Sequence, residues 1–136
     1  MKSFTRLLVL FVGLLFALPA LAQNPDRQKI ESAKIGLITN RLNLTPEQAP
    51  LFWPIYNEYS DKRRDISRQL RQSNKPGGNS AINELNESVE LKQKLVDLEK
   101  DYNSKFLKVI SAQQLQELHN TERMFNKMLM DQLRGN

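Results

Sequence analysis

Two five-residue stretches decide how this chain folds: Leu44-Thr45-Pro46-Glu47-Gln48 and Ile110-Ser111-Ala112-Gln113-Gln114. In each, a hydroxyl residue is followed three positions later by Gln. This spacing is typical of a capping box, in which the two side chains bond backbone amides at the start of a helix. In the first stretch Pro follows the hydroxyl residue, at a position where a helix needs no amide hydrogen. Both stretches therefore predict the start of a helix.

Outward from these two junctions, apolar residues recur every three to four positions, and no segment of five or more residues alternates cleanly. This pattern predicts an all-α chain of four helices: the first over about 25–43, the second over 46–73, a third marked from Ile82 to Phe106 and a fourth from Leu115 to Leu133. The apolar stripes that mark them are Ile30, Ala33, Leu37, Ile38 and Leu42; Phe52, Tyr56, Tyr59, Ile66 and Leu70; Ile82, Leu85, Val89, Val96, Tyr102 and Phe106; and Leu115, Leu118, Phe125, Met128 and Leu133.

The two central helices should form an antiparallel hairpin, because residues 73–80 are the one stretch dense in helix breakers. Each would be roughly 40 Å long. Pro50 and Pro54 remove backbone hydrogen bonds early in the second helix, so we expect a bend near Phe52 to Tyr56. Such a thin layer leaves one face unburied. That face either pairs with another copy or binds a partner, and we expect a homodimer.

The first 22 residues have the features of a signal peptide. Lys2 and Arg6 precede an apolar run of about a dozen residues, and Ala20-Leu21-Ala22 matches the pattern that signal peptidase cleaves. The run is shorter than the roughly 20 residues that span a bilayer. We therefore expect residues 1–22 to be removed and residues 23–136 to form one secreted domain without a stable membrane anchor. An uncleaved signal anchor is the alternative.

Composition excludes several classes of function. There is no Cys, so disulfides, thiolate metal sites and Cys nucleophiles are absent. Residues 23–136 carry 18 Lys and Arg against 15 Asp and Glu, a balance that gives no reason to expect nucleic acid as a partner. With a single His, no phosphate-binding glycine loop and no Ser-His-Asp spacing, nothing predicts an enzyme or a cofactor.

The two junction stretches resemble the LTxxQ motif of the Spy/CpxP family of small periplasmic proteins. The first, Leu44 to Gln48, matches the motif, and the second is a degenerate copy with Ile110 and Ser111 in place of Leu and Thr. The run Phe52-Trp53-Pro54-Ile55-Tyr56-Asn57-Glu58-Tyr59 is similar to the Bacteroidetes branch, whose members are often labelled periplasmic heavy-metal sensors or sensors of ECF-type sigma factors. The resemblance implies a periplasmic, cradle-like dimer of bent hairpins. Its concave face would hold unfolded protein or dock on a sensor kinase.

Within the motifs, Thr45, Gln48, Ser111 and Gln114 are fully explained as helix caps, and Leu44 and Ile110 complete the pattern. Two further groups are candidates for partner binding. Trp53 and Tyr59 belong to an aromatic cluster that could instead build the core. A basic stripe of Arg64, Arg68, Arg71 and Lys75 could attract acidic clients, or could pair with Glu84, Glu87 and Glu90 across the hairpin or simply be solvated.

The sequence offers few residues that could ligate a metal ion. His119 and Glu122 share a helical face, but a tight zinc or copper site needs three or four converging ligands. The sequence thus leaves two functional hypotheses. The first is an ATP-independent periplasmic chaperone or envelope-stress adaptor, which binds unfolded or signalling proteins on a helical surface. The alternative is a sensory accessory protein, which reports metal or envelope stress to a membrane signalling partner.

Overall fold

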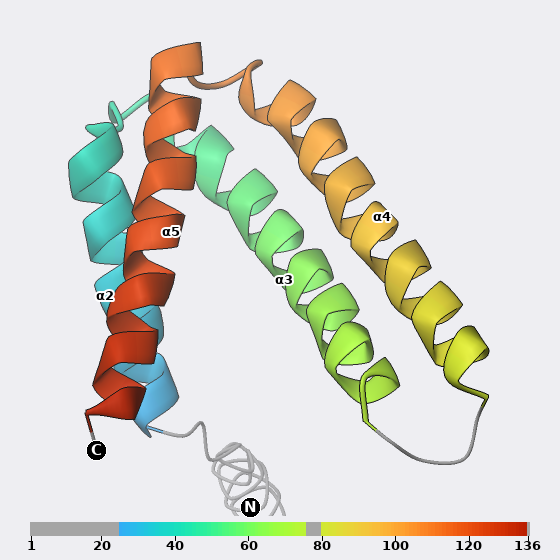
Figure 1. Ribbon diagram of the computed structural model, residues 1–136. Coiled ribbons are helices and arrows are strands. Elements are labelled where there is room, and N and C mark those ends of the chain that lie inside the picture. The colour runs from blue at the N-terminus through green and yellow to red at the C-terminus, as the bar shows by residue number, and fades with distance from the viewer. Residues whose placement is uncertain (1–24, 76–79, 136) are drawn as a thin grey trace, which may run out of the picture. The chain divides into compact units, whose positions relative to one another are not determined.

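A computed structural model describes residues 25–75 and 80–135 of the chain. The predicted signal peptide lies outside the described residues. The chain divides into two compact units, residues 1–35 and residues 36–136. Within the described residues the protein is all-α with four helices, as the periodicity predicted (Figure 1). No helix among them combines the length and apolar composition needed to cross a bilayer.

Helix α2, Pro25–Leu42, begins in the first unit and ends in the second. Pro at its first position and Asp26 in its first turn both suit a helix N-terminus, because no amide partner is lost and the helix dipole favours an acid there. The helix ends where Asn43 adopts φ = 50°, a left-handed conformation that Asn tolerates better than most residues. The chain then turns into the first junction.

Helix α3, Ala49–Ser73, begins three residues later than the predicted start at Pro46. The amide of Ala49 bonds the carbonyl of Thr45, at 3.0 Å, but Pro50 has no amide to bond the next carbonyl. The amide of Leu51 instead bonds the carbonyl of Gln48 at 3.1 Å. Residues 46–48 therefore form a turn, and the prediction of the helix start is corrected to Ala49.

Helix α4, Ala81–Phe106, packs against α3 as an antiparallel pair, which confirms the predicted hairpin. Ser80 stands at its N-cap with extended backbone, Glu84 lies in its first turn and Lys105 in its last. Helix α5, Ala112–Arg134, follows the second junction and begins where the capping pattern placed it. In Figure 1 the start of α4 lies beside the end of α3, away from the two junctions.

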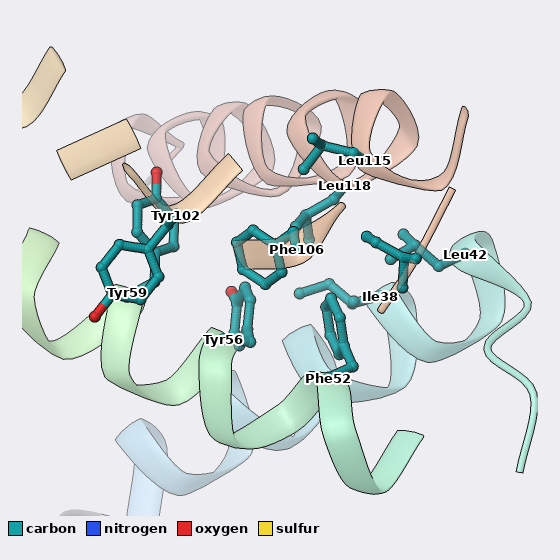
Figure 2. Packing of buried hydrophobic residues seen from close by; sticks show 10 residues of the cluster. Ile38, Leu42, Phe52, Tyr56, Tyr59, Tyr102, Phe106, Leu115 and Leu118 are labelled. Carbon is teal, nitrogen blue, oxygen red and sulfur yellow. The ribbon is translucent and has the colours of Figure 1, made fainter. Parts of the chain in front are cut away.

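The core gathers around the junctions and draws on the end of α2 and on the three later helices. Figure 2 shows Phe52 and Tyr56 of α3 beside Phe106, which ends α4, with Leu118 of α5 close by. The buried cluster consists of Ile38, Leu42, Phe52, Tyr56, Tyr59, Tyr102, Phe106, Ile110, Leu115 and Leu118. Aromatic rings supply much of it, and they pack edge to face and in tilted pairs, as their charge distribution favours.

The apolar residues predicted to form one stripe on the third helix lie on two different faces of α4. Tyr102 and Phe106 are buried, whereas Ile82, Leu85, Val89 and Val96 are 61, 63, 63 and 48% exposed. The residues that α4 buries farther from the junctions are Ser88 and Leu91. Similarly, α5 buries Leu115, Leu118 and Phe125 and leaves Met128 and Leu133 exposed. Periodicity identified the helices but merged the inner and outer faces of α4.

Candidate functional site

The first junction has the reciprocal bonds of a capping box. The amide of Gln48 donates to Thr45 Oγ1 at 3.1 Å, and the amide of Thr45 donates to Gln48 Oε1 at 3.2 Å. Because α3 begins only at Ala49, this box closes the turn that precedes the helix. Leu44 is half-buried against the core and anchors the turn.

The second junction repeats the box directly on a helix. Ser111 is the N-cap of α5; its Oγ accepts from the amide of Gln114 at 3.1 Å, and its own amide donates to Gln114 Oε1 at 2.9 Å. Ile110, just before the cap, is buried in the core. The degenerate second motif therefore keeps the physical function of the first.

The two Gln side chains also bond each other, which sequence reasoning did not foresee. Gln48 Nε2 donates to Gln114 Oε1 at 3.0 Å, and Gln114 Nε2 donates to Gln48 Oε1 at 2.9 Å. Each remaining donor bonds a carbonyl at the opposite junction, Gln48 to Val109 at 3.3 Å and Gln114 to Leu42 at 3.1 Å. We call this pair of side chains the Gln clasp. Both amides use all their donors and acceptors, so the clasp joins the junctions without an unsatisfied polar group.

A second contact between positions 66 residues apart follows the clasp. Tyr56 on α3 donates to Glu122 Oε1 on α5 at 3.1 Å, the same sequence separation as between Gln48 and Gln114. Glu122 is only 5% exposed, and its other oxygen accepts from Arg63 at 3.2 Å. A carboxylate buried this deeply requires such partners, because desolvation would otherwise disfavour its charge. Polar side chains thus join α5 at two levels, to the turn before α3 through the Gln clasp and to α3 itself through Tyr56.

Helix α3 is tied to α4 by a charged cluster around Tyr102. The Tyr102 hydroxyl donates to Glu58 Oε1 at 2.5 Å, and Lys62 donates to the same oxygen at 2.8 Å. Lys62 and Lys105 also lie over the Tyr102 ring, at 5.4 and 4.3 Å from its centre. The hydrogen bond from Lys62, followed by that from Tyr102, lowers the pKa of Glu58 to about 2. The bond to Glu58 in turn raises the pKa of Lys62.

The aromatic candidates for partner binding divide between core and boundary. Tyr59 is 3% exposed and packs on Tyr102 and Phe106, and burial is the main cause that raises its pKa to about 12. This burial removes Tyr59 from the candidate partner surface. Trp53 is half-buried and packs edge-on against Phe52, with ring centres 5.0 Å apart. Part of the Trp53 ring therefore remains accessible.

The basic stripe lies on the side of α3 away from its buried residues. Arg64 and Arg68 form ion pairs with Asp61 and Asp65, at 3.5 and 3.6 Å, three residues earlier on the same helix. Arg68, Arg71 and Lys75 are exposed. Pairs of this kind at the surface contribute little stability and leave the cations available to solvent.

His119 and Glu122 contact different helices. His119 Nε2 lies 3.0 Å from Asn103 Oδ1 on α4, whereas Glu122 bonds Tyr56 and Arg63 on α3. Within residues 25–75 and 80–135, no three His, Asp or Glu side chains converge where they could hold a metal ion. The structure therefore does not bring the two candidate ligands into one site.

The outer face of α4 is the feature that sequence reasoning missed. We define it by Ile82, Leu85, Val89 and Val96, which repeat at the spacing of one helix face and are all about half or more exposed. Large apolar side chains grouped on a surface mark places where other molecules bind. Their spacing was visible in the sequence, but nothing there distinguished this face from the one that packs on α3.

Comparisons of the chain with models of protein families, with curated proteins and with solved structures find no match. The resemblance drawn from the two junction motifs therefore rests on their residues alone.

Proposed function

We propose that this protein is a periplasmic, ATP-independent chaperone or envelope-stress adaptor, which binds unfolded or partner proteins along α4. The single observation that carries the proposal is the outer face of α4, where Ile82, Leu85 and Val89 are each more than 60% exposed. Complete burial of a fully exposed side chain of this kind contributes about 1.5 to 3 kcal/mol, and these side chains, already partly covered, would contribute a part of that each. That is enough for transient binding when several act together.

Two further features support this proposal. The core is concentrated near the junctions, so the far part of the α3–α4 hairpin buries few residues, chiefly Ser88 and Leu91 on α4. A lightly packed helix pair adjusts to varied partners at low cost. The predicted signal peptide supports the periplasmic location, and the two junction motifs support the family resemblance. The cradle-like homodimer remains a prediction of that resemblance, and the bend in α3 remains a prediction from Pro50 and Pro54.

The alternative, a metal-reporting sensor, has less support. Its candidate ligands His119 and Glu122 have different neighbours and contact different helices. A signalling partner could nonetheless be the protein that α4 binds, and the adaptor function includes that case.

The test is suppression of aggregation of an unfolding client by the protein purified from cells that express the full chain. Leu85→Lys and Val89→Lys together should reduce suppression by roughly an order of magnitude, because they place charge on the apolar face. As a matched comparison, Arg64→Glu with Arg68→Glu changes charge on α3 and leaves the outer face of α4 intact. Failure of the unmodified protein to suppress aggregation in molar excess would contradict the proposal. So would full activity of the Lys variant.

A further inference from the structure

Three of the chain's four methionines lie close together on α5. They are Met124, Met128 and Met130, and the fourth, Met1, belongs to the predicted signal peptide. The chain has no Cys. The sulfur atoms of residues 23–136 therefore all belong to these three thioethers, and a thioether is a group that oxidants commonly modify in proteins.

The end of α5 exposes two of these side chains. Met128 is 57% exposed and Met130 is 50% exposed. They lie about 160° apart around the helix, so this part of α5 is open to solvent on two opposite sides. Among residues 126–135 every residue is exposed except Leu129, which is partly buried. An oxidant can therefore reach both side chains without any movement of the fold.

The core, by contrast, offers no sulfur to an oxidant. The buried cluster of the described residues consists of aliphatic and aromatic side chains. Phe125 is the last residue that α5 buries, and it precedes Met128. Met124, one turn before Met128, is partly buried. Oxidation of Met128 and Met130 would therefore add polar oxygen atoms to the surface and leave the packing of the core unchanged.

We propose that Met128 and Met130 form a site of reversible oxidation to methionine sulfoxide by hydroperoxides. In this step the sulfur lone pair attacks one peroxide oxygen, so that an S–O bond forms while the O–O bond breaks. The hydrogen on the transferred oxygen passes to the departing oxygen, which leaves as water or an alcohol. The sulfur is oxidised by two electrons and the peroxide is reduced by the same two.

The reverse step and the physical consequence also follow from this chemistry. Sulfoxide reductases remove the oxygen as water and take the two electrons from thiols, which become a disulfide. Met128, Met130 and Leu133 give the end of α5 an exposed apolar surface. Because a sulfoxide is polar, oxidation would make two of these three side chains polar, and reduction would restore the apolar surface.

The experiment treats protein purified from cells that express the full chain with graded hydrogen peroxide and follows each methionine by peptide mass spectrometry. Trypsin cleaves after Arg123, Lys127 and Arg134, so Met124 lies in a different peptide from Met128 and Met130. Each sulfoxide adds about 16 Da, the mass of one oxygen. Met128 and Met130 should be oxidised roughly twofold or more faster than Met124, because they are more exposed. Equal or faster oxidation of Met124 would overturn the inference.

Matched variants test the consequence for the surface. Met128→Leu with Met130→Leu keeps apolar, helix-forming side chains and removes both sulfur atoms, whereas Met124→Leu is the control. Oxidation should lower the binding of a hydrophobic dye to the natural protein and to the control, and should not change it in the double variant. Treatment with both methionine sulfoxide reductases and dithiothreitol should restore the lost signal. Unchanged dye binding by the oxidised natural protein, or an equal loss in the double variant, contradicts the proposal.

Circular dichroism separates a surface change from unfolding. The helical signal of the natural protein should be nearly the same before and after oxidation, since the two residues lie outside the core. A clear loss of helix on oxidation that the double variant does not show would mean that these methionines support the fold, and would also overturn the inference. None of these measurements involves a client, so the inference stands or fails independently of the proposed function.

Discussion

The two junctions use the same two side chains on differently built backbones. At the first junction Thr45 and Gln48 close a turn, and α3 starts only afterwards at Ala49. At the second, Ser111 and Gln114 cap α5 directly. The difference comes from Pro50, which cannot supply the amide that would extend α3 back to the motif. The hydroxyl-to-Gln spacing therefore specifies a local bond pattern, and the following residues decide whether it begins a helix.

The correspondence continues along α3 and α5. Phe52 and Leu118 are also 66 residues apart and are both fully buried, as Tyr56 and Glu122 are buried and in contact. The two helices differ in charge at one of these pairs. Glu122 of α5 is a buried acid, whereas its counterpart on α3, Tyr56, is aromatic, and the cation that pairs with Glu122 is Arg63 of α3. Equivalent positions thus share their burial more closely than their chemistry.

The largest expected effect comes from removing equivalent core residues. Phe52→Ala should lower the free energy of unfolding by about 4 kcal/mol and Leu118→Ala by about 3 kcal/mol, because both leave cavities. Phe52 loses more since its ring also packs on Tyr56 and Phe106, with centres 5.7 and 5.5 Å away. Urea unfolding measures both. A greater loss of stability for Leu118→Ala would show that the core depends more on α5 than on α3.

Breaking the Gln clasp should have the next largest effect. Gln48→Ala and Gln114→Ala should each cost about 2 kcal/mol, because each removes four hydrogen bonds and leaves half-buried polar groups without partners. The double variant should cost clearly less than the sum of the two, as expected for side chains that bond each other.

Gln113→Ala provides the matched control for the clasp. This residue belongs to the same motif but is exposed, so its loss should change stability by less than about 0.5 kcal/mol. Strict additivity of the two clasp substitutions, measured from urea midpoints, would contradict the mutual bonding of Gln48 and Gln114.

Removing the capping hydroxyls should cost different amounts of stability at the two junctions. Ser111→Ala should cost about 1 kcal/mol, since it removes a direct N-cap of α5. Thr45→Ala should cost less, because its bond closes a turn ahead of α3. The exchanges Thr45→Ser and Ser111→Thr keep the capping hydroxyl, so they serve as controls and should change little. A larger loss at Thr45 would show that the turn, rather than the helix start, is the stabilising element.

The smallest expected effect is on stability at low pH, and it involves Glu58 of α3, which has no acidic counterpart on α5. Glu58 has a folded pKa of about 2, against an ordinary value of 4.5, and the position 66 residues later is Met124. A lowered pKa contributes stability that is fully present above about pH 4.5 and is lost as the pH falls through about 2. Between pH 6 and pH 2 the natural protein should therefore lose slightly more stability than Glu58→Gln. Because Glu58 is largely exposed, solvent screening keeps the difference small. Equal losses in the two proteins would contradict the pKa shift.

The sequence predicted much of the fold, but it predicted fewer of the contacts at the candidate site. The four helices, the hairpin and the start of α5 agree with the periodicity and capping patterns. Tyr59 was misplaced because an aromatic residue with a polar tip suits both core and surface. The buried pairing of Glu122 with Tyr56 could not be foreseen, since a sequence gives the separation between residues but not which distant side chains meet.

By itself, the sequence determined that this protein is helical and where its chain turns, because capping bonds and helix periodicity act between residues a few positions apart. Only the tertiary structure decided that Gln48 bonds Gln114 and that Ile82, Leu85 and Val89 face outward. Both outcomes depend on which surfaces meet when α3, α4 and α5 pack. Apolar residues on one helix face recur at the same spacing in the sequence whether that face packs on another helix or is exposed to water.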